Sequence, residues 1–437
     1  MLADESSDEV PALRIANCSG FYGDRLSAMR EMLDGGPIDV ITGDYLAELT
    51  MLILGKDQLR DASLGYARTF LAQLADCLVD ALDRGVRIVA NAGGLNPFGL
   101  AKRIDELAAG LGVDVTVGVI DGDNLTSRAE ELGFPGALTA NAYLGAFGIA
   151  RALDAGAHVV VTGRVTDASV VVGPGIWHHR WTESDLDQLA GAVVAGHIIE
   201  CGTQATGGNF SGFLDLPRDA HPLGFPIAEL RSDGSSVITK HPGTGGMATL
   251  DTVTAQLFYE IQGPQYLNPD VSTDLGSIQL ADAGPDRVLV HGVKGSKPPE
   301  RLKVATNTLG GYRNQMEFVL VGLDIEAKEA WLRAQLEWAL SDRPPSEIIW
   351  TRGPLPQSDA DSEEGAACLL RCVVKDPDAD VVGKPFTAAG VELALASYPG
   401  FTLTAPPGRP SPFGVYRPAY VDRDQVVERV TVGGREL

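Results

Sequence analysis

An arginine and an aspartate follow a short apolar run at a spacing that suits chemistry. The run covers residues 158–162, Gly163 ends it, and Arg164 and Asp167 stand three positions apart just after it. A guanidinium offers forked donors to a carboxylate or phosphate, and a carboxylate can accept a proton. The spacing predicts either a pair that faces a ligand or two side chains that bind each other or cap a helix.

A second stretch, residues 203–213, combines small, hydroxyl and amide side chains around two adjacent glycines. Glycine-flanked amides can hold an anion or form an oxyanion hole for a thioester carbonyl. A plain tight loop is the alternative, and Cys201 just before it suits a buried structural thiol better than a nucleophile. The candidates for ligand contact are Thr206, Gly207 and Gly208, with Asn209 as a candidate catalytic residue.

A third stretch, residues 240–246, reads Lys-His-Pro-Gly-Thr-Gly-Gly and leads into a predicted helix that begins at residue 249. A glycine-rich turn at a helix N-terminus, with a lysine and a histidine beside it, suits an anionic ligand such as a phosphate or carboxylate. The end of a hairpin with an exposed lysine is the competing interpretation. The candidates are Lys240, Thr244 and Gly245 as ligand contacts and His241 as a proton carrier.

Acidic and histidine residues give little support to a metal site. Asp121 and Asp123 could present oxygens to Mg²⁺, but no third carboxylate follows at a fixed spacing, so helix capping is the preferred interpretation. The seven histidines show neither HExxH nor HxH spacing, which argues against zinc. Neither a phosphate-binding loop nor a GxGxxG motif after a strand occurs, so we assign no cofactor, although Mg²⁺ stays open.

Alternating strand and helix patterns must position these residues. Short Val/Ile-rich runs alternate with helical patterns of ten or more residues, which predicts an α/β fold with a parallel, Rossmann-like sheet built from βα repeats. The expected strands begin at Leu13 and cover residues 39–42, 86–90, 113–120 and 158–162, and the expected helices cover 26–33, about 70–84, 99–111 and about 141–155. Ligands bind such sheets at the carboxyl ends of the strands.

The ends of the five expected strands share a polar, glycine-rich character. They are Asn17, Ser19 and Gly20; Gly43 and Asp44; Asn91, Gly93 and Gly94; Asp121, Asp123 and Asn124; and Thr162, Gly163 and Arg164. Glycine lets backbone amides approach a ligand closely, and small polar side chains orient it. Such turns also use these residue types to cap helices. Five such ends together predict a shared cleft, with Ser19, Gly20, Gly43, Asp44, Gly93, Gly94 and Gly163 as ligand contacts.

The pattern of predicted elements changes after residue 213: the predicted loops are longer and the predicted helices are fewer. Asp233-Gly234-Ser235 lies between two apolar runs and predicts a hairpin turn. The βαββα order after Glu317 predicts a small α+β sandwich. The expected organisation is a flexible arm over 1–12, a parallel α/β core over 13–213, a mixed extension over 214–316 and a C-terminal α+β subdomain over 317–437.

Composition excludes several classes of protein. The chain has 437 residues and a formal net charge of −23, which argues against a nucleic acid as partner. No apolar run reaches the roughly 20 residues that a membrane span needs. Five cysteines without a CxxC pair, and no signal-peptide pattern at the start, predict a reduced, cytoplasmic protein.

Several motifs together resemble a known family. They are IANCSGFYGDR (15–25), DVITGDYLAELTM (39–51), ANAGGLNP (90–97), the run from Ala140 to Pro174, ECGTQATGGNFSGF (200–213) and KHPGTGG (240–246). In this order they are similar to the acyclic terpene utilisation AtuA family over residues 13 to about 340. The resemblance implies an acyl-CoA or branched carboxylic acid substrate by association with terpenoid breakdown. Many members of the family also carry a C-terminal ferredoxin-like module, so the resemblance implies that the subdomain after Glu317 is either a variant of that module or an integral part of the fold.

The leading hypothesis is an enzyme without a redox cofactor that acts on an acyl thioester or related carboxylate by hydration, lyase or acyl-transfer chemistry. Arg164 or Lys240 would hold an anion, and Asp167 or His241 would move the proton. A non-catalytic partner subunit that binds a coenzyme A ester or nucleotide is the alternative. A nucleotide-dependent ligase would need Mg²⁺ at Asp121 and Asp123. We expect a small-molecule acyl substrate, no membrane partner and a homo-oligomer.

Overall fold

Two compact units make up the chain. A computed structural model describes residues 10–217, 222–357 and 359–437, so most of the expected N-terminal arm, 1–12, lies outside the described residues. Unit 1 comprises Met1–Asn307 and Tyr416–Leu437, and unit 2 comprises Thr308–Val415. The domain boundaries expected from the sequence stay a prediction.

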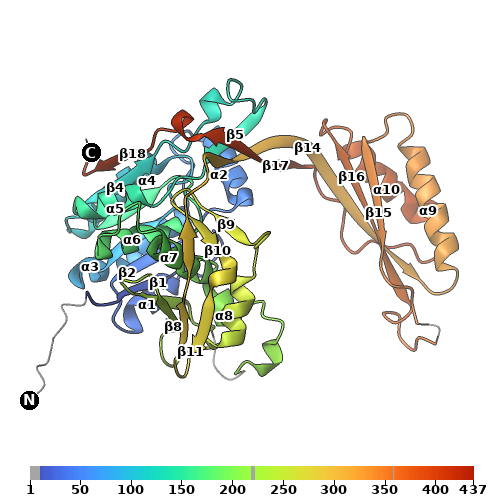
Figure 1. The fold of residues 1–437 in the computed structure, drawn as a ribbon. Coiled ribbons are helices and arrows are strands. Elements are labelled where there is room, and N and C mark those ends of the chain that lie inside the picture. The colour runs from blue at the N-terminus through green and yellow to red at the C-terminus, as the bar shows by residue number, and fades with distance from the viewer. Residues whose placement is uncertain (1–9, 218–221, 358) are drawn as a thin grey trace, which may run out of the picture. The chain divides into compact units, whose positions relative to one another are not determined.

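Unit 1 is built on a mixed sheet of eleven strands, in the order β11-β12-β8-β7-β1-β2-β3-β6-β4-β18-β19 (Figure 1). Its middle is parallel: β1 (Leu13–Asn17), β2 (Val40–Gly43), β3 (Arg87–Ala90), β6 (Val159–Thr162) and β4 (Val117–Asp121). Antiparallel strands extend both sides: β7 (Pro226–Leu230), β8 (Ser236–Lys240), β12 (Val288–His291) and β11 (Gln279–Asp282) beyond β1, and β18 (Arg429–Val432) and β19 (Arg435–Glu436) beyond β4.

Helices cover both faces of this sheet. One layer contains α1 (Ala28–Asp34), α3 (Arg68–Asp83) and α4 (Pro97–Leu111), and the other contains α5 (Phe147–Asp154), α6 (Ser169–His179) and α7 (Leu186–Glu200). Coverage of both faces explains why the parallel strands are continuous Val/Ile runs rather than alternating ones, because each strand is buried on its two sides.

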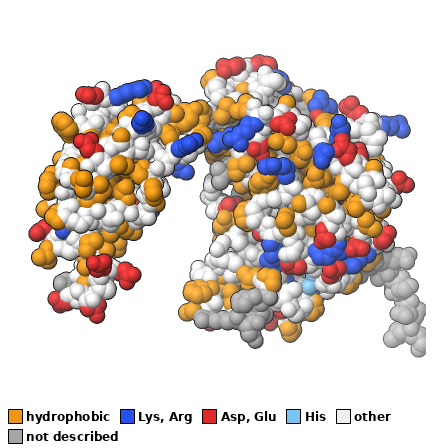
Figure 2. Space-filling model, turned by 180° about the vertical axis from the view of Figure 1, so that it is seen from behind, with side chains coloured by type: hydrophobic (Ala, Val, Ile, Leu, Met, Phe, Trp, Pro, Cys, Tyr) orange, Lys and Arg blue, Asp and Glu red, His pale blue; other side chains and the backbone are white. Residues whose placement is uncertain are grey.

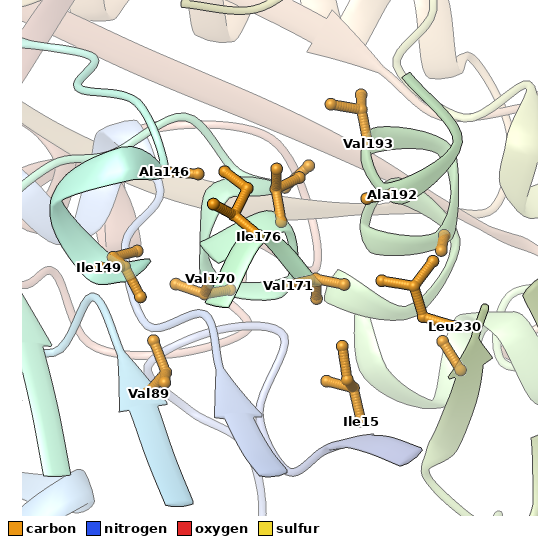
Figure 3. Close-up of a cluster of buried hydrophobic side chains, with 14 of the residues drawn as sticks. Ile15, Val89, Ala146, Ile149, Val170, Val171, Ile176, Ala192, Val193 and Leu230 are labelled. Carbon is orange, nitrogen blue, oxygen red and sulfur yellow. The ribbon is translucent and has the colours of Figure 1, made fainter. Parts of the chain in front are cut away.

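A continuous core joins the second helical layer to the sheet. Figure 3 shows Ile15 and Val89 of the strands facing Val170 and Val171 of α6, all of them 0% exposed. Burial of one such side chain stabilises the fold by about 1.5–3 kcal/mol. The same core includes α7, in which every residue from Leu189 to Glu200 is buried.

Smaller elements complete unit 1. They are α2 (Glu48–Arg60), β5 (Ala137–Ala142), α8 (Leu250–Leu257) and a three-stranded sheet of β9 (Gln265–Leu267), β10 (Ser272–Asp274) and β13 (Lys294–Ser296). The three-stranded sheet contacts α7 through β10 and β13. The helix therefore lies between this sheet and the main one.

Unit 2 contains an antiparallel sheet in the order β15-β16-β14-β17. In chain order its elements are β14 (Arg301–Val321), α9 (Ile325–Ala339), β15 (Glu347–Arg352), β16 (Ala367–Asp376), α10 (Lys384–Ala396) and β17 (Ser411–Asp422). Alternate residues of β14 and β16, such as Phe318 and Leu370, pack against α9 and α10 and are 0% exposed. The first part of β14 belongs to unit 1, where β5 pairs with it.

The predicted α/β class with parallel βα core strands is confirmed, and the hairpin at Asp233-Gly234-Ser235 forms between β7 and β8. The sheet is larger and more mixed than expected. A helix was expected over about 141–155, but β5 occupies residues up to Ala142 and α5 begins only at Phe147. No helix in the described part of the chain is long and apolar enough to cross a membrane.

Candidate functional site

A crevice is expected where the connections after two neighbouring parallel strands leave toward opposite faces of the sheet. Here β3 is followed by α4 in the first helical layer, and β6, its neighbour, is followed by α6 in the second. The turns after β2, β3 and β6 therefore border one position at the carboxyl edge. Asp44, Asn91, Arg164 and Asp167 all lie on these turns.

Arg164 is buried at this edge and is 2% exposed. Its Nη2 atom donates to Asp167 Oδ1 at 2.5 Å, Nη1 donates to the carbonyl of Leu46, and the guanidinium lies 4.5 Å from the ring centroid of Tyr143. Of the two expectations for this pair, mutual binding is therefore observed. Asp167 nevertheless keeps about a third of its side chain exposed (31%), so its carboxylate remains accessible.

Asp44 is held beside this pair by donors on two turns. Asn91 Nδ2 donates to its Oδ1 atom at 2.7 Å, and the amide of Leu46 donates to the same oxygen at 3.0 Å. The pKa of Asp44 is raised to about 7, chiefly by burial and then by the negative charge of Asp167, while the positive charge of Arg164 opposes the shift. A carboxyl group that titrates near neutral pH can both give and take a proton.

Glu200 is a third carboxyl group in the same cluster, at the C-terminal end of α7. Burial raises its pKa well above the usual value, and repulsion from Asp167 and then Asp44 acts in the same direction. Its Oε1 atom lies 3.1 Å from His197 Nδ1, and His197 Nε2 lies 3.2 Å from the carbonyl of Leu257. Within the described residues, Glu200 Oε2 is buried without a hydrogen-bond partner.

Asn268 contributes an amide near the turn after β6. Thr166 Oγ1 donates to Asn268 Oδ1 at 2.9 Å, and both residues are buried. Asn268 Nδ2 is buried and, among the residues that the structure describes, has no acceptor. A buried polar atom without a partner costs about 1–3 kcal/mol, so two of them near one turn indicate a place where a ligand or water supplies the missing bonds.

Asp121 and Asp123 are engaged with other protein groups. Asp121 forms an ion pair with Arg429 of β18, and Asp123 accepts from the Arg164 amide at 2.8 Å and from Asn141 Nδ2 at 2.7 Å. The two side chains do not cap a helix, contrary to the preferred interpretation from sequence. No group of three or more His, Cys, Asp or Glu side chains in the described ranges could hold a metal ion.

Tight packing explains several of the glycines at the strand ends. A Cβ atom at Gly163 would lie 2.2 Å from Asp123 Oδ1, and one at Gly93 would lie 2.5 Å from the carbonyl oxygen of Thr162. Gly20 packs in the same way on the backbone of Glu200 and Cys201. These contacts bring the turns after β1, β3 and β6 and the end of α7 together around the carboxyl cluster.

The remaining expected contacts at the strand ends are also internal. Ser19 is 1% exposed, and its Oγ atom donates to the carbonyl of Phe21 at 2.9 Å. Gly43 packs against the ring of Tyr45, and Gly94 packs against Leu54 and the carbonyl of Gly65. These three residues support the turns next to Asp44 and Asn91.

The loop over residues 203–209 uses its amides internally. The amide of Gly207 donates to Gln204 O at 3.2 Å, and that of Gly208 donates to Thr203 O at 2.9 Å. Thr206 Oγ1 donates to the carbonyls of Thr203 and Gly224, and Asn209 is exposed, with Nδ2 3.1 Å from Gln204 Oε1. Both glycine amides therefore already have acceptors within the turn.

The loop over residues 240–246 packs beside that one, since the amide of Met247 donates to Thr206 O at 3.0 Å. Lys240 Nζ donates to the carbonyl of Thr244 at 2.9 Å and pairs with Asp286 at 3.2 Å. The amide of Gly245 donates to the carbonyl of Pro222 at 3.0 Å. The charge of Lys240 is thus balanced by Asp286 rather than left for a ligand.

His241 lies against α1 instead of the carboxyl cluster. Its Nε2 atom is 3.0 Å from the carbonyl of Met32, and its ring packs on Gly35. Burial lowers the pKa of His241, so the ring is neutral at physiological pH. Cys201, by contrast, lies next to the cluster, but burial raises the pKa of its thiol, which keeps it protonated and unreactive.

Comparison with known families assigns the chain. The model of the acyclic terpene utilisation family protein AtuA matches residues 13–432. The chain belongs to this family. The match extends well past the span that the sequence motifs marked and includes both units of the AtuA-type chain. No curated protein and no solved structure matches it.

Sequence reasoning placed Asp44, Arg164 and Asp167 of this AtuA family chain at the strand ends but did not assign a role to Glu200 or His197. One signal could have found them. After the first turn of α7, every residue except His197 and Glu200 is apolar or glycine, and these two stand three residues apart and so share a face. Polar side chains inside an apolar helix need partners when they are buried, and that requirement marks them as candidates.

Proposed function

We propose that the chain is an enzyme that moves a proton on a small carbonyl or thioester substrate at the carboxyl edge of β2, β3 and β6. One observation carries the proposal: three carboxyl groups interact with the buried guanidinium of Arg164. Asp167 forms an ion pair with it, Asp44 and Glu200 feel its charge, and burial raises the pKa of the latter two. Carboxyl groups whose raised pKa keeps them protonated up to neutral pH are typical of acid–base sites.

Each group has a separate role in the proposal. Asp167, the accessible carboxylate, is the general base that takes a proton from water or from a substrate carbon. Glu200, kept neutral by burial, donates a hydrogen bond from Oε2 to the substrate oxygen. Arg164 is a positioning residue that fixes Asp167. Asp44 exchanges with Asp167 the proton that Asp167 has taken. A neutral carboxylic acid serves as such a donor in other enzymes.

The family suggests the substrate class. The matching family is described by acyclic terpene utilisation, and acyclic terpenes are branched chains. We therefore propose a branched acyl-CoA or related branched carboxylic acid as substrate, with hydration or lyase chemistry favoured over acyl transfer. Hydration needs a base that takes a proton from water, a donor to the carbonyl oxygen while hydroxide adds to the β-carbon, and return of that proton to the α-carbon. Asp167 takes and returns the proton, and Glu200 donates to the oxygen.

A branched enoyl thioester tests this proposal. The full chain is incubated with 3-methylcrotonyl-CoA in water and in deuterated water, and the product mass is followed. We expect addition of one water, and we expect Asp167→Asn to lower kcat by at least ~100-fold. Asp105→Asn, at an exposed position on α4, is the matched control and should retain the wild-type rate.

Two substitutions of Glu200 separate its roles. Glu200→Gln preserves a hydrogen-bond donor and should retain much of the activity, whereas Glu200→Leu removes the donor and should lower kcat by ~10²–10³-fold. Wild-type rates in Asp167→Asn or in Glu200→Leu contradict the proposal. Stabilisation of the chain by the thioester without any turnover would instead support the alternative of a non-catalytic binding subunit.

For unit 2 we propose the ferredoxin-like arrangement that the family resemblance implies. Its elements follow one another as β-α-β-β-α-β, and both helices pack on one face of the sheet. The first and third strands, β14 and β16, lie in the middle of the sheet order. Homo-oligomer formation and the cytoplasmic location stay predictions.

A further inference from the structure

Unit 2 contains a hollow beside one edge of β14. Residues 402–404 run along β14, with Thr404 N donating to Glu317 O at 3.0 Å and a bridge between Phe318 and Leu403. Farther along, β17 is the neighbour of β14, and Gly310 packs on Phe413. Between these two contacts the chain leaves the strand, and a pocket of about 400 Å³ lies there.

Prolines and one buried amide hold the hollow open. Pro406, Pro407 and Pro410 have no backbone N–H with which to pair to β14. Asn314, which is 6% exposed, donates from Nδ2 to Gly408 O at 3.1 Å and to Val382 O at 2.9 Å. It thereby fixes the bulged loop at a set position, so the pocket is formed without a ligand.

Three arginines line this pocket, and their partners differ. Arg371 binds Glu317 at 2.9 Å, and Glu317 is the one acidic residue of the lining. The other arginines of unit 2 outside the pocket, Arg333, Arg343 and Arg352, each pair with a carboxylate. Among the described residues, Arg313 and Arg409 have no carboxylate within 4.0 Å, and both line the pocket.

The lining therefore carries an excess of two positive charges on a chain whose net charge is −23. Figure 2 shows unit 2 as the smaller body, with hydrophobic side chains over much of its visible face and scattered acidic and basic groups between them. On such an acidic chain, two arginines without a carboxylate partner suit a ligand group that carries two negative charges. A phosphate carries about −1.5 to −2 at neutral pH, and guanidiniums bind its oxygens in forked pairs.

We propose that this hollow is a second ligand site, for a small molecule that carries a phosphate or pyrophosphate group. Its volume lies within the roughly 300–1,000 Å³ of small-molecule sites. Arg313 and Arg409 bind the phosphoryl oxygens, while Gln315, Thr404 and Ser411 supply neutral polar groups around them. The site is independent of the carboxyl cluster of unit 1 and of the chemistry proposed there.

Calorimetric titration of the full chain with inorganic pyrophosphate, ADP and citrate tests the site. We expect pyrophosphate and ADP to bind, and Arg313→Gln and Arg409→Gln each to weaken binding by at least ~10-fold. Arg343→Gln is the matched control, because Arg343 is exposed in the same unit and pairs with Asp378 at 2.6 Å. It should bind as the wild type does.

Three results would overturn the site. Pyrophosphate and ADP could fail to bind, Arg313→Gln and Arg409→Gln could bind like Arg343→Gln, or citrate could bind as tightly as pyrophosphate, which would make carboxylates the ligand. All variants alter exposed side chains, and unchanged unfolding midpoints would show that they are folded. Hydration activity depends on unit 1 and is measured separately, so loss of one proposal leaves the other testable.

Discussion

Asp44 makes the stability of the protein depend on pH. Burial raises its pKa from 3.8 to about 7, so between these values the folded state holds a proton that the unfolded state has lost. The free energy of unfolding must therefore fall as pH rises from about 4 to about 7. Because one unit of pKa shift corresponds to about 1.4 kcal/mol, the contribution of this group is on the order of a few kcal/mol.

Asp44→Asn should remove this part of the pH dependence. Urea unfolding at pH 5 and pH 8 measures the difference in free energy of unfolding, and we expect a smaller difference in the variant than in the wild type. Some pH dependence will remain, because burial also raises the pKa of Asp123 to about 6 and that of Glu428 to about 7. Asp83→Asn, at an exposed position, is the control. An identical pH dependence in Asp44→Asn and the wild type would contradict the assignment.

At the scale of residues, the sequence predicted where a residue lies in the fold better than it predicted which groups surround its side chain. A buried run followed by a glycine and a polar residue identifies a strand end, so Asp44 and Arg164 could be placed at one edge. Whether a lysine or histidine is free for a ligand depends on partners distant in sequence. Asp286 pairs with Lys240, and Met32 with His241, and no spacing rule indicates either contact.

At the scale of elements, the backbone of the turn between β7 and β8 lies very close to α7. A Cβ atom at Gly191 would lie 2.1 Å from the carbonyl oxygen of Gly234, in the turn between β7 and β8. Replacement of glycine by alanine inside a helix normally stabilises it by roughly 0.5–1 kcal/mol. Here the neighbour is backbone and cannot rotate away, so the steric effect should dominate.

Gly191→Ala should therefore destabilise unit 1 by about 1–3 kcal/mol, which is typical of overpacking. Gly110→Ala is a matched control inside α4, since no atom lies within 4 Å of its added Cβ. It should stabilise the protein by about 0.5–1 kcal/mol. Urea midpoints of both variants measure the two effects. If Gly191→Ala stabilised the protein as Gly110→Ala does, α7 and the hairpin would not be in the close contact described.

Elements with strong local periodicity were predicted to within a few residues, and the others were not. The strands β2, β3 and β6 end at glycine or polar turns and are continuous apolar runs. By contrast β5 has the sequence ALTANA, which fits a helix equally well, and only its pairing with β14 makes it a strand. The RVTV segment of β18 is four residues long, and its partner β4 lies about 300 residues away.

At the scale of the whole molecule, the chain returns to unit 1 after unit 2 has been completed. Residues 416–437 belong to unit 1, and β18 pairs with β4 from Arg429 opposite Asp121 to Val432 opposite Gly118. Val430 is 0% exposed within the core that includes α5, α6 and α7. The C-terminal segment is thus a structural part of the unit that contains the carboxyl cluster.

Val430→Ala should lower the free energy of unfolding by about 2 kcal/mol, because it removes two buried methyl groups and leaves a small cavity. Hydrogen exchange locates the effect: amides of β4 should exchange faster, and those of β16 in unit 2 should be unchanged. Val427→Ala alters a side chain of the same segment that is 68% exposed, and it should change stability by no more than about 0.5 kcal/mol. Faster exchange in β16, or equal effects of the two variants, would mean that the C-terminal segment does not stabilise unit 1.

Because β4 and β6 are adjacent and Asp123 follows β4, loss of β18 should also disturb the turn that holds Arg164.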